Sequence, residues 1–309
     1  MPMQFYVAEH PHQTIRQINE QFITQAIELQ RKDPKHHAVE LIFGSHARNS
    51  SLVMTRAFID YMNSKGVLFT ARKSGDAFGY ANRIGFFSDF KNAEYEYQKH
   101  DANGRFIELE KIESHDVHVA GRVQKALDQY SERPGIIISV EAHEILLYSI
   151  GELISNVRRH AYFSGRVSFQ YYPKRGINEI TVCDCGIGII DSLRKAYQGS
   201  DEDLLKMSIQ NGITSSISHG PYAERSPGVG LFNLCKLAEQ NPNAQVTIYT
   251  KNYNMIVNSR YPVETPYINV LSCSFPGTMV CVSIPNLVSV DLKNILRQSY
   301  TFTGNQFIV

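Results

Sequence analysis

The chain has 309 residues, of which 43% are hydrophobic and 20% charged, enough apolar material for two globular domains. Its 31 Lys and Arg nearly balance its 30 Asp and Glu, and a formal net charge of +1 argues against a nucleic-acid-binding or anionic-membrane-binding protein. No apolar run approaches the roughly 20 residues that cross a bilayer, and no secretory signal pattern opens the chain. Because five cysteines, an odd number, favour reduced thiols, we expect a cytoplasmic protein.

The first third of the chain alternates between helical and strand-like segments. Apolar residues at helical spacing predict helices over residues 14–32 and 52–65, and short apolar runs predict strands over 37–43 and 67–71. The stretch AFGYANRIGFFSDF closes this region, and the polar stretch EYQKHDANGR marks a boundary near residues 95–105. We therefore expect an α/β domain over residues 1–104.

The rest of the chain predicts a second α/β domain over residues 105–290, with a tail over 291–309. Helices are expected over residues 117–132, 139–162, 201–212 and 229–240, and strands over 166–174, 177–186, 245–257 and 278–285. This order predicts an α/β sandwich, in which helices cover one mixed, mostly antiparallel sheet. Residues 251–275 are compatible with a hairpin extension or a partner surface, and the tail with a packed helix and strand or a partner-docking segment.

The stretch GELISNVRRHAY, residues 151–162, places polar groups along one face of a helix. Glu152, Asn156 and His160 are four residues apart, so they form one stripe beside the apolar Leu153 and Val157. Polar groups next to a buried face need partners, and a polar or charged ligand supplies them.

Three further stretches carry residues suited to binding a nucleotide. In DCGIGI, Asp184 can accept a hydrogen bond from an exocyclic amine, and its glycines allow close approach of a ligand. In SPGVGL, which opens a helix, glycines can turn backbone N–H groups toward phosphate. In PGTMV, Gly277 and Thr278 begin a strand.

In this order and spacing the four stretches resemble the ATP-binding domain of the GHKL superfamily, which has the Bergerat fold and includes gyrase, Hsp90-type chaperones, histidine kinases and MutL. The resemblance covers about the C-terminal two-thirds of the chain. It implies ATP and Mg²⁺ as cofactors, with Asn156 as the Mg²⁺ ligand and Asp184 reading the adenine amino group. It assigns the remaining nucleotide contacts to His160, Gly186, Gly188, Ile189, Arg225, Gly228, Val229, Gly230, Leu231 and Thr278.

GELISNVRRHAY is especially similar to the anti-sigma-factor serine kinases, and the pairing of such a domain with the N-terminal region described next implies, by resemblance, a bacterial source. Glu152 is then the candidate general base for attack on the γ-phosphate, the alternative being a solvated or capping glutamate. The long segment between Asp184 and Gly228 suits a lid, in which Arg225 and His219 either contact the γ-phosphate or are solvated. His143 is expected to be a structural histidine rather than a phosphoacceptor.

The N-terminal region is similar to the STAS fold of anti-sigma-factor antagonists. Asn49-Ser50-Ser51 stands where that family has Asp-Ser-Ser, so Ser50 is either a phosphoacceptor or a helix N-cap, and we favour the cap because Leu52 replaces a glycine of the family pattern. Cys183 and Cys185 are expected to pack, and the histidine pairs His10/His12, His36/His37 and His115/His118 lack the neighbours that a metal site needs.

Three functions follow from this resemblance. The leading one is an ATP-dependent kinase that transfers the γ-phosphate to Ser or Thr of a regulatory protein partner or of the N-terminal domain. The alternatives are a slow ATPase that drives a conformational cycle, and a nucleotide sensor without turnover. Because GHKL domains often pair, a homodimer is also compatible with the sequence.

Overall fold

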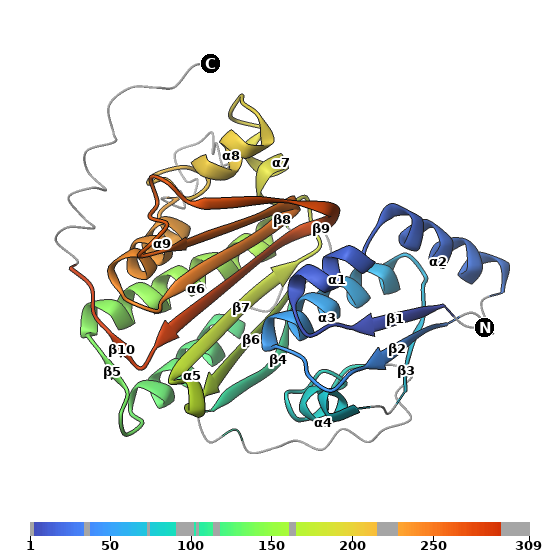
Figure 1. Ribbon diagram of the computed structural model, residues 1–309, viewed down its shortest axis with the longest axis horizontal. Coiled ribbons are helices and arrows are strands. Elements are labelled where there is room, and N and C mark those ends of the chain that lie inside the picture. Colours follow the sequence, from blue (N-terminus) through green and yellow to red (C-terminus); the bar gives the residue numbers. More distant parts are fainter. Residues whose placement is uncertain are drawn as a thin grey trace.

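The computed structural model is a mixed α/β structure built around a five-stranded antiparallel sheet (Figure 1). It describes residues 3–33, 38–72, 75–90, 102, 105–113, 118–160, 165–214 and 228–291, without the side chain of His160. The strand order is β4-β6-β7-β9-β8, and every neighbouring pair runs antiparallel, where the sequence led us to expect a mixed sheet. The strands are β4 (Phe106–Ile112), β6 (Gly165–Tyr172), β7 (Ile177–Asp184), β8 (Gln245–Asn258) and β9 (Tyr267–Pro285).

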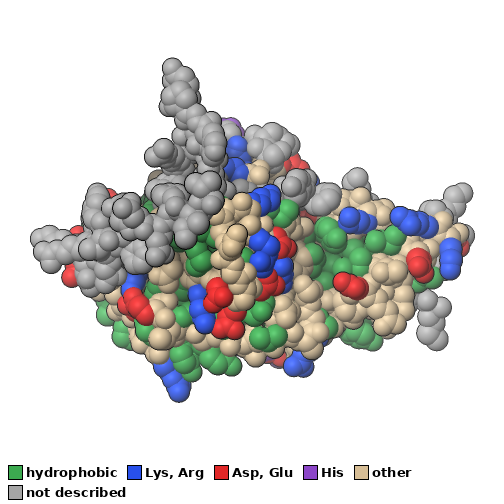
Figure 2. Space-filling view, turned by 90° about the horizontal axis from the view of Figure 1, so that it is seen from above, with side chains coloured by type: hydrophobic (Ala, Val, Ile, Leu, Met, Phe, Trp, Pro, Cys, Tyr) green, Lys and Arg blue, Asp and Glu red, His purple; other side chains and the backbone are tan. Residues whose placement is uncertain are grey.

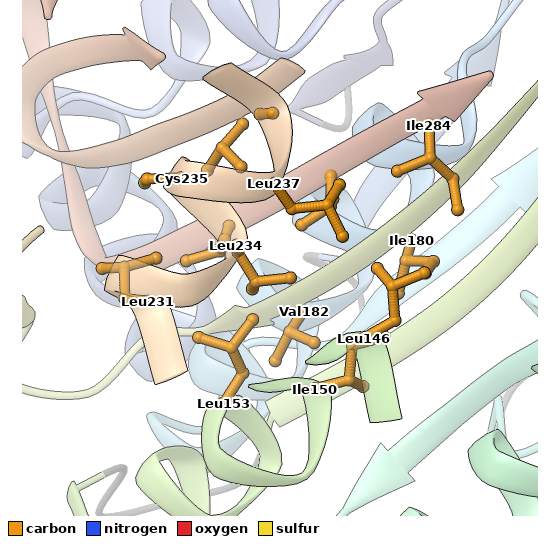
Figure 3. Close-up of a cluster of buried hydrophobic side chains, with 14 of the residues drawn as sticks. Leu146, Ile150, Leu153, Ile180, Val182, Leu231, Leu234, Cys235, Leu237 and Ile284 are labelled. Carbon is orange, nitrogen blue, oxygen red and sulfur yellow. The ribbon is translucent and has the colours of Figure 1, made fainter. Parts of the chain in front are cut away.

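Helices α5 (Val119–Ser131), α6 (Val140–His160) and α9 (Gly230–Gln240) cover one face of this sheet (Figure 1). Alternate residues of the strands, such as Ile180 and Val182, point toward these helices, because side chains alternate between the faces of a sheet. Figure 3 shows Leu146, Ile150 and Leu153 of α6 and Leu234 of α9 packed against them. Burial of this apolar face holds the helices on the sheet.

Two short helices and a small ribbon border this layer. Helices α7 (Ile189–Leu193) and α8 (Asp201–Met207) follow β7, and Ser200 caps α8 by accepting a hydrogen bond from the N–H of Asp203. Strand β5 (Ile137–Ile138) pairs in parallel with β10 (Leu287–Val288) just before α6 begins.

The N-terminal residues form a smaller layer around a parallel sheet of order β1-β2-β3. Its strands are β1 (Gln4–Val7), β2 (Val39–Phe43) and β3 (Phe69–Arg72), and its helices are α1 (Pro11–Gln17), α2 (Glu20–Lys32), α3 (Asn49–Ser64) and α4 (Gly75–Arg83). The single helix expected over residues 14–32 is therefore wrong. It breaks at Ile18 because Asn19 is extended and its side-chain oxygen accepts a hydrogen bond from the N–H of Phe22, 2.7 Å away, which caps α2.

This N-terminal layer packs on the opposite face of the five-stranded sheet (Figure 1). Helix α3 contacts β6 and β7, and α1 contacts β9. Cys183, Cys185 and Met279 point to this side and share one apolar cluster with Phe58 and Leu52 of α3. Residues from both sides of the predicted boundary near residue 104 belong to this cluster, so the boundary does not separate two independent hydrophobic cores.

Two buried arginines and two aspartates also join the layer to the sheet. Arg166 of β6 contacts Asp60 of α3 at 2.7 Å and Asp89 at 2.6 Å, and Arg56 contacts the same two carboxylates at 2.8 and 2.5 Å. Both guanidinium groups are almost fully buried, so their charges depend on these partners.

Several other segments differ from the expectations. Strand β4 was not anticipated, and α8 ends at Met207 rather than continuing to residue 212. Residues 251–275 belong mostly to the β8–β9 hairpin, so the expected hairpin extension is present. The tail lies outside the described residues beyond Asp291.

No helix in the described part of the chain has the length and apolar character needed to cross a bilayer. Seen from above, acidic and basic side chains lie beside one another on that face rather than in separate patches (Figure 2). This mixture agrees with a formal net charge of only +1.

Candidate functional site

A pocket opens between α6, the end of β7, the start of α9 and strand β9. Fragments distant in the sequence meet there because β7 and β9 are neighbours in the sheet and α6 and α9 lie side by side on it. The residues that line it include nine of the predicted site residues: Glu152, Asn156, Asp184, Gly188, Ile189, Gly228, Gly230, Leu231 and Thr278.

Asp184 is the last residue of β7 and pairs in register with Thr278 of β9. Its carboxylate accepts a hydrogen bond from the N–H of Gly186 at 2.7 Å, which fixes its direction. Burial raises the pKa of Asp184 to about 6, and the Gly186 hydrogen bond opposes this shift. A partly buried carboxylate at a pocket wall is suited to accept hydrogen bonds from a ligand.

Gly277 allows β9 to pass close to the backbone of Asp184. Its φ is 114°, and a Cβ added there would lie 2.2 Å from the backbone oxygen of Asp184. Any side chain would push the two strands apart where Asp184 and Thr278 meet. The glycine in PGTMV therefore has a packing reason.

The hydroxyl of Thr278 holds the loop that follows Asp184. It accepts a hydrogen bond from the N–H of Ile189 at 2.9 Å, while the hydroxyl of Thr250 on β8 donates to the carbonyl of Gly277 at 2.9 Å. Gly188 precedes α7 with a φ of 74°, a conformation that favours glycine. These contacts fix the Asp184–Ile189 loop to the sheet.

Gly230 brings the start of α9 against α6. A Cβ added to Gly230 would lie 2.7 Å from the Cβ of Glu152, so only glycine permits this approach. Gly228 has a φ of 63° and lies close to the backbone of Ile213, where an added Cβ would be 2.4 Å from the carbonyl oxygen. Gly230 therefore allows α9 to lie close to α6, and Gly228 allows the residues before α9 to lie close to the segment after α8.

Asn156 lies one turn after Glu152 on α6, and both residues line the pocket, where Glu152 is partly buried and Asn156 is exposed. The side-chain oxygen of Asn156 accepts a hydrogen bond from the guanidinium of Arg159 at 3.1 Å. Among the described residues, no three His, Cys, Asp or Glu side chains group as metal ligands. An amide oxygen at the pocket wall is one of the oxygen donors that a hard cation such as Mg²⁺ accepts.

Some predicted residues lie outside the pocket lining. Gly186 contributes its N–H to Asp184, and Val229 is the N-cap residue of α9. His160 ends α6, but its side chain is not described, and Arg225 and His219 lie outside the described residues.

The sequence interpretation missed much of the apolar and hydroxyl lining. Val182 is two residues before Asp184, and Val280 is two after Thr278, so the alternation of side chains along each strand already placed them on the pocket face. The loops and short helices gave no such signal. The missed lining residues are Leu153, Val157, Val182, Ser192, Leu193, Ser208, Ile213, Thr214 and Val280.

Ser50 is neither an exposed phosphoacceptor nor the N-cap of α3. The cap residue is Arg48, and Ser50 is only 3% exposed within the first turn. The N–H of Ser50 donates instead to the carboxylate of Glu179 on β7 at 2.9 Å. Burial raises the pKa of Glu179, and hydrogen bonds from Ser50 oppose the shift. A backbone N–H in the first turn of α3 is thus bonded to a glutamate that is distant in the sequence.

The histidines and cysteines have structural surroundings where they are described. His143 contacts Asp128 of α5 at 2.8 Å, which joins α5 to α6. His12 packs edge-on against Tyr249, with ring centroids 5.1 Å apart. Cys183 and Cys185 are buried in the cluster shared with the N-terminal layer, as expected. The members His36, His37 and His115 lie outside the described residues.

Comparisons of the chain with models of known protein families, with curated proteins and with solved structures found no match.

Proposed function

We propose that the chain is an ATP- and Mg²⁺-binding regulatory protein of the GHKL type that transfers the γ-phosphate to Ser or Thr of a partner protein. The supporting observation is the convergence of four distant stretches on one pocket lining: Glu152 and Asn156, Asp184, Gly228 and Gly230, and Thr278. A chance resemblance of short motifs gives no reason for these stretches to meet. The N-terminal layer is proposed to be a STAS-like regulatory part, and the larger sheet with its helices a Bergerat-type domain.

Each residue has a role that its surroundings suit. The Asp184 carboxylate would accept from the adenine amino group, with Thr278 beside it holding the loop. The start of α9, an 11-residue helix, would direct backbone N–H groups at the phosphates. Asn156 would ligate Mg²⁺, which supplies positive charge to the phosphate oxygens when bound.

Glu152 would act as the general base. It lies one helical turn from Asn156 and lines the same pocket, so its carboxylate is placed to take the proton of an attacking hydroxyl. In transfer to a partner, the hydroxyl oxygen would bond to the γ-phosphorus, the proton would pass to Glu152, and ADP would leave with the bonding electron pair.

Calorimetry with ATP and Mg²⁺ tests the proposal, with Leu287→Ala as the control because Leu287 is exposed on β10, outside the pocket lining. Wild-type protein and the control should bind ATP, and Asp184→Ala should weaken binding at least tenfold because the adenine amine loses its acceptor. Asn156→Ala should remove the dependence of affinity on Mg²⁺. Absence of ATP binding by the wild-type protein would refute the proposal.

A further inference from the structure

Two cations and two carboxylates form a closed ring of ion pairs beside the pocket. The ammonium of Lys251 on β8 contacts Asp191 of α7 at 2.6 Å and Asp201 of α8 at 3.3 Å. The guanidinium of Arg194, the residue after α7, contacts the same two carboxylates. Three members of the ring belong to the segment that contains α7 and α8, and Lys251 is the member that the sheet contributes.

The segment that carries this ring also forms one wall of the pocket. Ser192 of α7 and Ser208, which follows α8, both line the pocket. At the start of α7, the N–H of Ile189 donates to the hydroxyl of Thr278 on β9 at 2.9 Å. Farther along the segment, α7 contacts β8 (Figure 1). The ion pairs of Lys251 therefore connect this wall of the pocket to the outer strand of the sheet.

The backbone of Lys251 has a conformation that lysine rarely adopts. Its φ is 48°, and in the described part of the chain Asn243 is the only other non-glycine residue with a positive φ. Asparagine tolerates this left-handed region, whereas a lysine there costs free energy that other interactions must offset. The strained backbone at Lys251 therefore points to a role that needs its side chain in this direction.

An irregularity in the pairing of β8 with β9 accompanies this conformation. Thr250 pairs with Thr278 but Lys251 pairs with Phe275, so β9 has two extra residues at this point. One of them is Gly277, which lets β9 pass close to the end of β7. A bulge bends a strand and changes the direction of a side chain. The same irregularity thus brings β9 against β7 at the pocket and directs Lys251 toward α7 and α8.

Apolar packing and the ion-pair ring hold the α7–α8 segment in different ways. Ile190 of α7 and Leu204 and Leu205 of α8 are fully buried in the core, so the segment stays packed on the protein without the ring. The side chains of the ring are between 29% and 47% exposed, and exposed ion pairs add little to the free energy of unfolding. The ring is therefore suited to orient the pocket wall rather than to stabilise the fold.

We propose that Lys251 is a positioning residue for the nucleotide, which holds α7 and α8 against β8 so that Ser192 and Ser208 are in place before ATP binds. The inference rests on the proposed function and adds to it a residue outside the pocket lining. Without the ammonium of Lys251, the wall has more freedom in the nucleotide-free protein. ATP must then order the wall as it binds, and this cost lowers its affinity.

Removing the ammonium tests this inference. Lys251→Met keeps an unbranched apolar side chain, and Lys206→Met is its matched control, because Lys206 pairs at 2.6 Å with Glu202 of the same helix. Lys251→Arg restores the positive charge. The measurements are the affinity for ATP with Mg²⁺ by calorimetry at low and high salt, amide hydrogen exchange of α7 and α8 without nucleotide, and unfolding in urea.

ATP should bind to Lys251→Met at least about fivefold more weakly than to the wild type and to Lys206→Met, and Lys251→Arg should recover most of this loss. The difference between Lys251→Met and the wild type should shrink in about 1 M NaCl, because salt screens the ring in the wild type. Without nucleotide, the backbone amides of α7 and α8 should exchange faster in Lys251→Met, while its midpoint of unfolding in urea is unchanged.

Equal ATP affinity of Lys251→Met and Lys206→Met would overturn the inference. A loss of affinity that Lys251→Arg does not recover, or that accompanies a lower midpoint in urea, would also overturn it, since packing rather than charge would then be the cause. Absence of ATP binding by the wild type would instead refute the proposed function. In that case, unchanged exchange of α7 and α8 in Lys251→Met would separately show that Lys251 does not hold these helices.

Discussion

Replacing Asp184 by Asn is expected to stabilise the nucleotide-free protein at neutral pH. Burial raises the pKa of Asp184 to about 6 from the usual 3.8, so the folded chain holds this proton more tightly than the unfolded chain does. The carboxyl group therefore favours folding most at pH values below 3.8, and that contribution is lost as the pH rises through 6. Asn avoids the buried charge and keeps an oxygen that can accept from the N–H of Gly186.

The magnitude follows from the two pKa values. A difference of about two pKa units corresponds to roughly 3 kcal/mol at pH values above 6, taken as an upper bound because the carboxylate is only partly buried. The amide of the Asp184→Asn variant cannot ionise, so this variant should exceed the wild type in free energy of unfolding by up to about that amount at pH 7.5. The difference should fall to less than about 1 kcal/mol near pH 4, where the wild-type carboxyl is neutral in the folded state and the pH is close to its unfolded pKa of 3.8.

Urea unfolding of both proteins at pH 7.5, 6 and 4 measures this difference. The pH 4 comparison is the internal control, because the two side chains then carry no charge in the folded state. The same variant should bind ATP more weakly than the wild type, since the amide offers the adenine amine a weaker acceptor than the carboxylate. If Asp184→Asn is no more stable than the wild type at pH 7.5, burial does not raise the pKa of Asp184 in the folded protein.

Three further predictions address catalysis and packing. Glu152→Gln should lower phosphoryl transfer to peptide at least hundredfold while changing ATP affinity by calorimetry less than about threefold; an unchanged transfer rate would exclude Glu152 as the base. Gly277→Ala should lower the free energy of unfolding by more than about 2 kcal/mol in urea, because its Cβ would meet the backbone of Asp184. Arg166→Met should lower the free energy of unfolding by about 3 kcal/mol in urea, since Asp60 loses a buried partner. An unchanged free energy of unfolding would show that this ion pair contributes little to stability.

Long amphipathic helices were predictable from the sequence, whereas the start of β9 was not, because this strand begins at Tyr267 rather than at the expected residue 278. Helices α5, α6 and α9 begin and end within two residues of the expected bounds, because their apolar periodicity extends over three or more turns. Strand β4 was missed for a physical reason. Its pairing with β6 shifts register between Ile107 and Glu110, so buried and exposed residues do not alternate regularly along FIELEKI.

The residues of the candidate site that could be predicted are those with a polar side chain in an apolar strand or with a backbone conformation that favours glycine. Asp184 and Gly277 stand out in their motifs, and the structure gives both a local reason. The apolar lining from Ile213 and Leu193 was not predictable, since an isoleucine or leucine in a short helix or loop looks like any core residue. Which apolar residues meet is decided by tertiary packing.

Ser50 shows why a local motif can mislead. Its resemblance to a phosphoacceptor serine rests on three adjacent residues, but its surroundings are set by Glu179, 129 positions away on β7. No pattern near Ser50 indicates that a buried carboxylate would accept from its N–H. Transfer to Ser50 would require the first turn of α3 to leave the sheet.

The sheet itself separates Ser50 from the candidate nucleotide pocket. Val182 and Asp184 of β7 face α6 and α9, whereas Glu179 and Cys183 of the same strand face the N-terminal layer. A phosphoryl group at the pocket therefore cannot reach Ser50 of the same folded chain. We expect Ser50→Ala to leave all transfer from γ-labelled ATP unchanged, measured as label on peptide and on the protein. If the wild-type chain became labelled and the Ser50→Ala variant did not, α3 would have to detach from β7 during the reaction. The core that the N-terminal layer shares with the sheet would then open during the reaction.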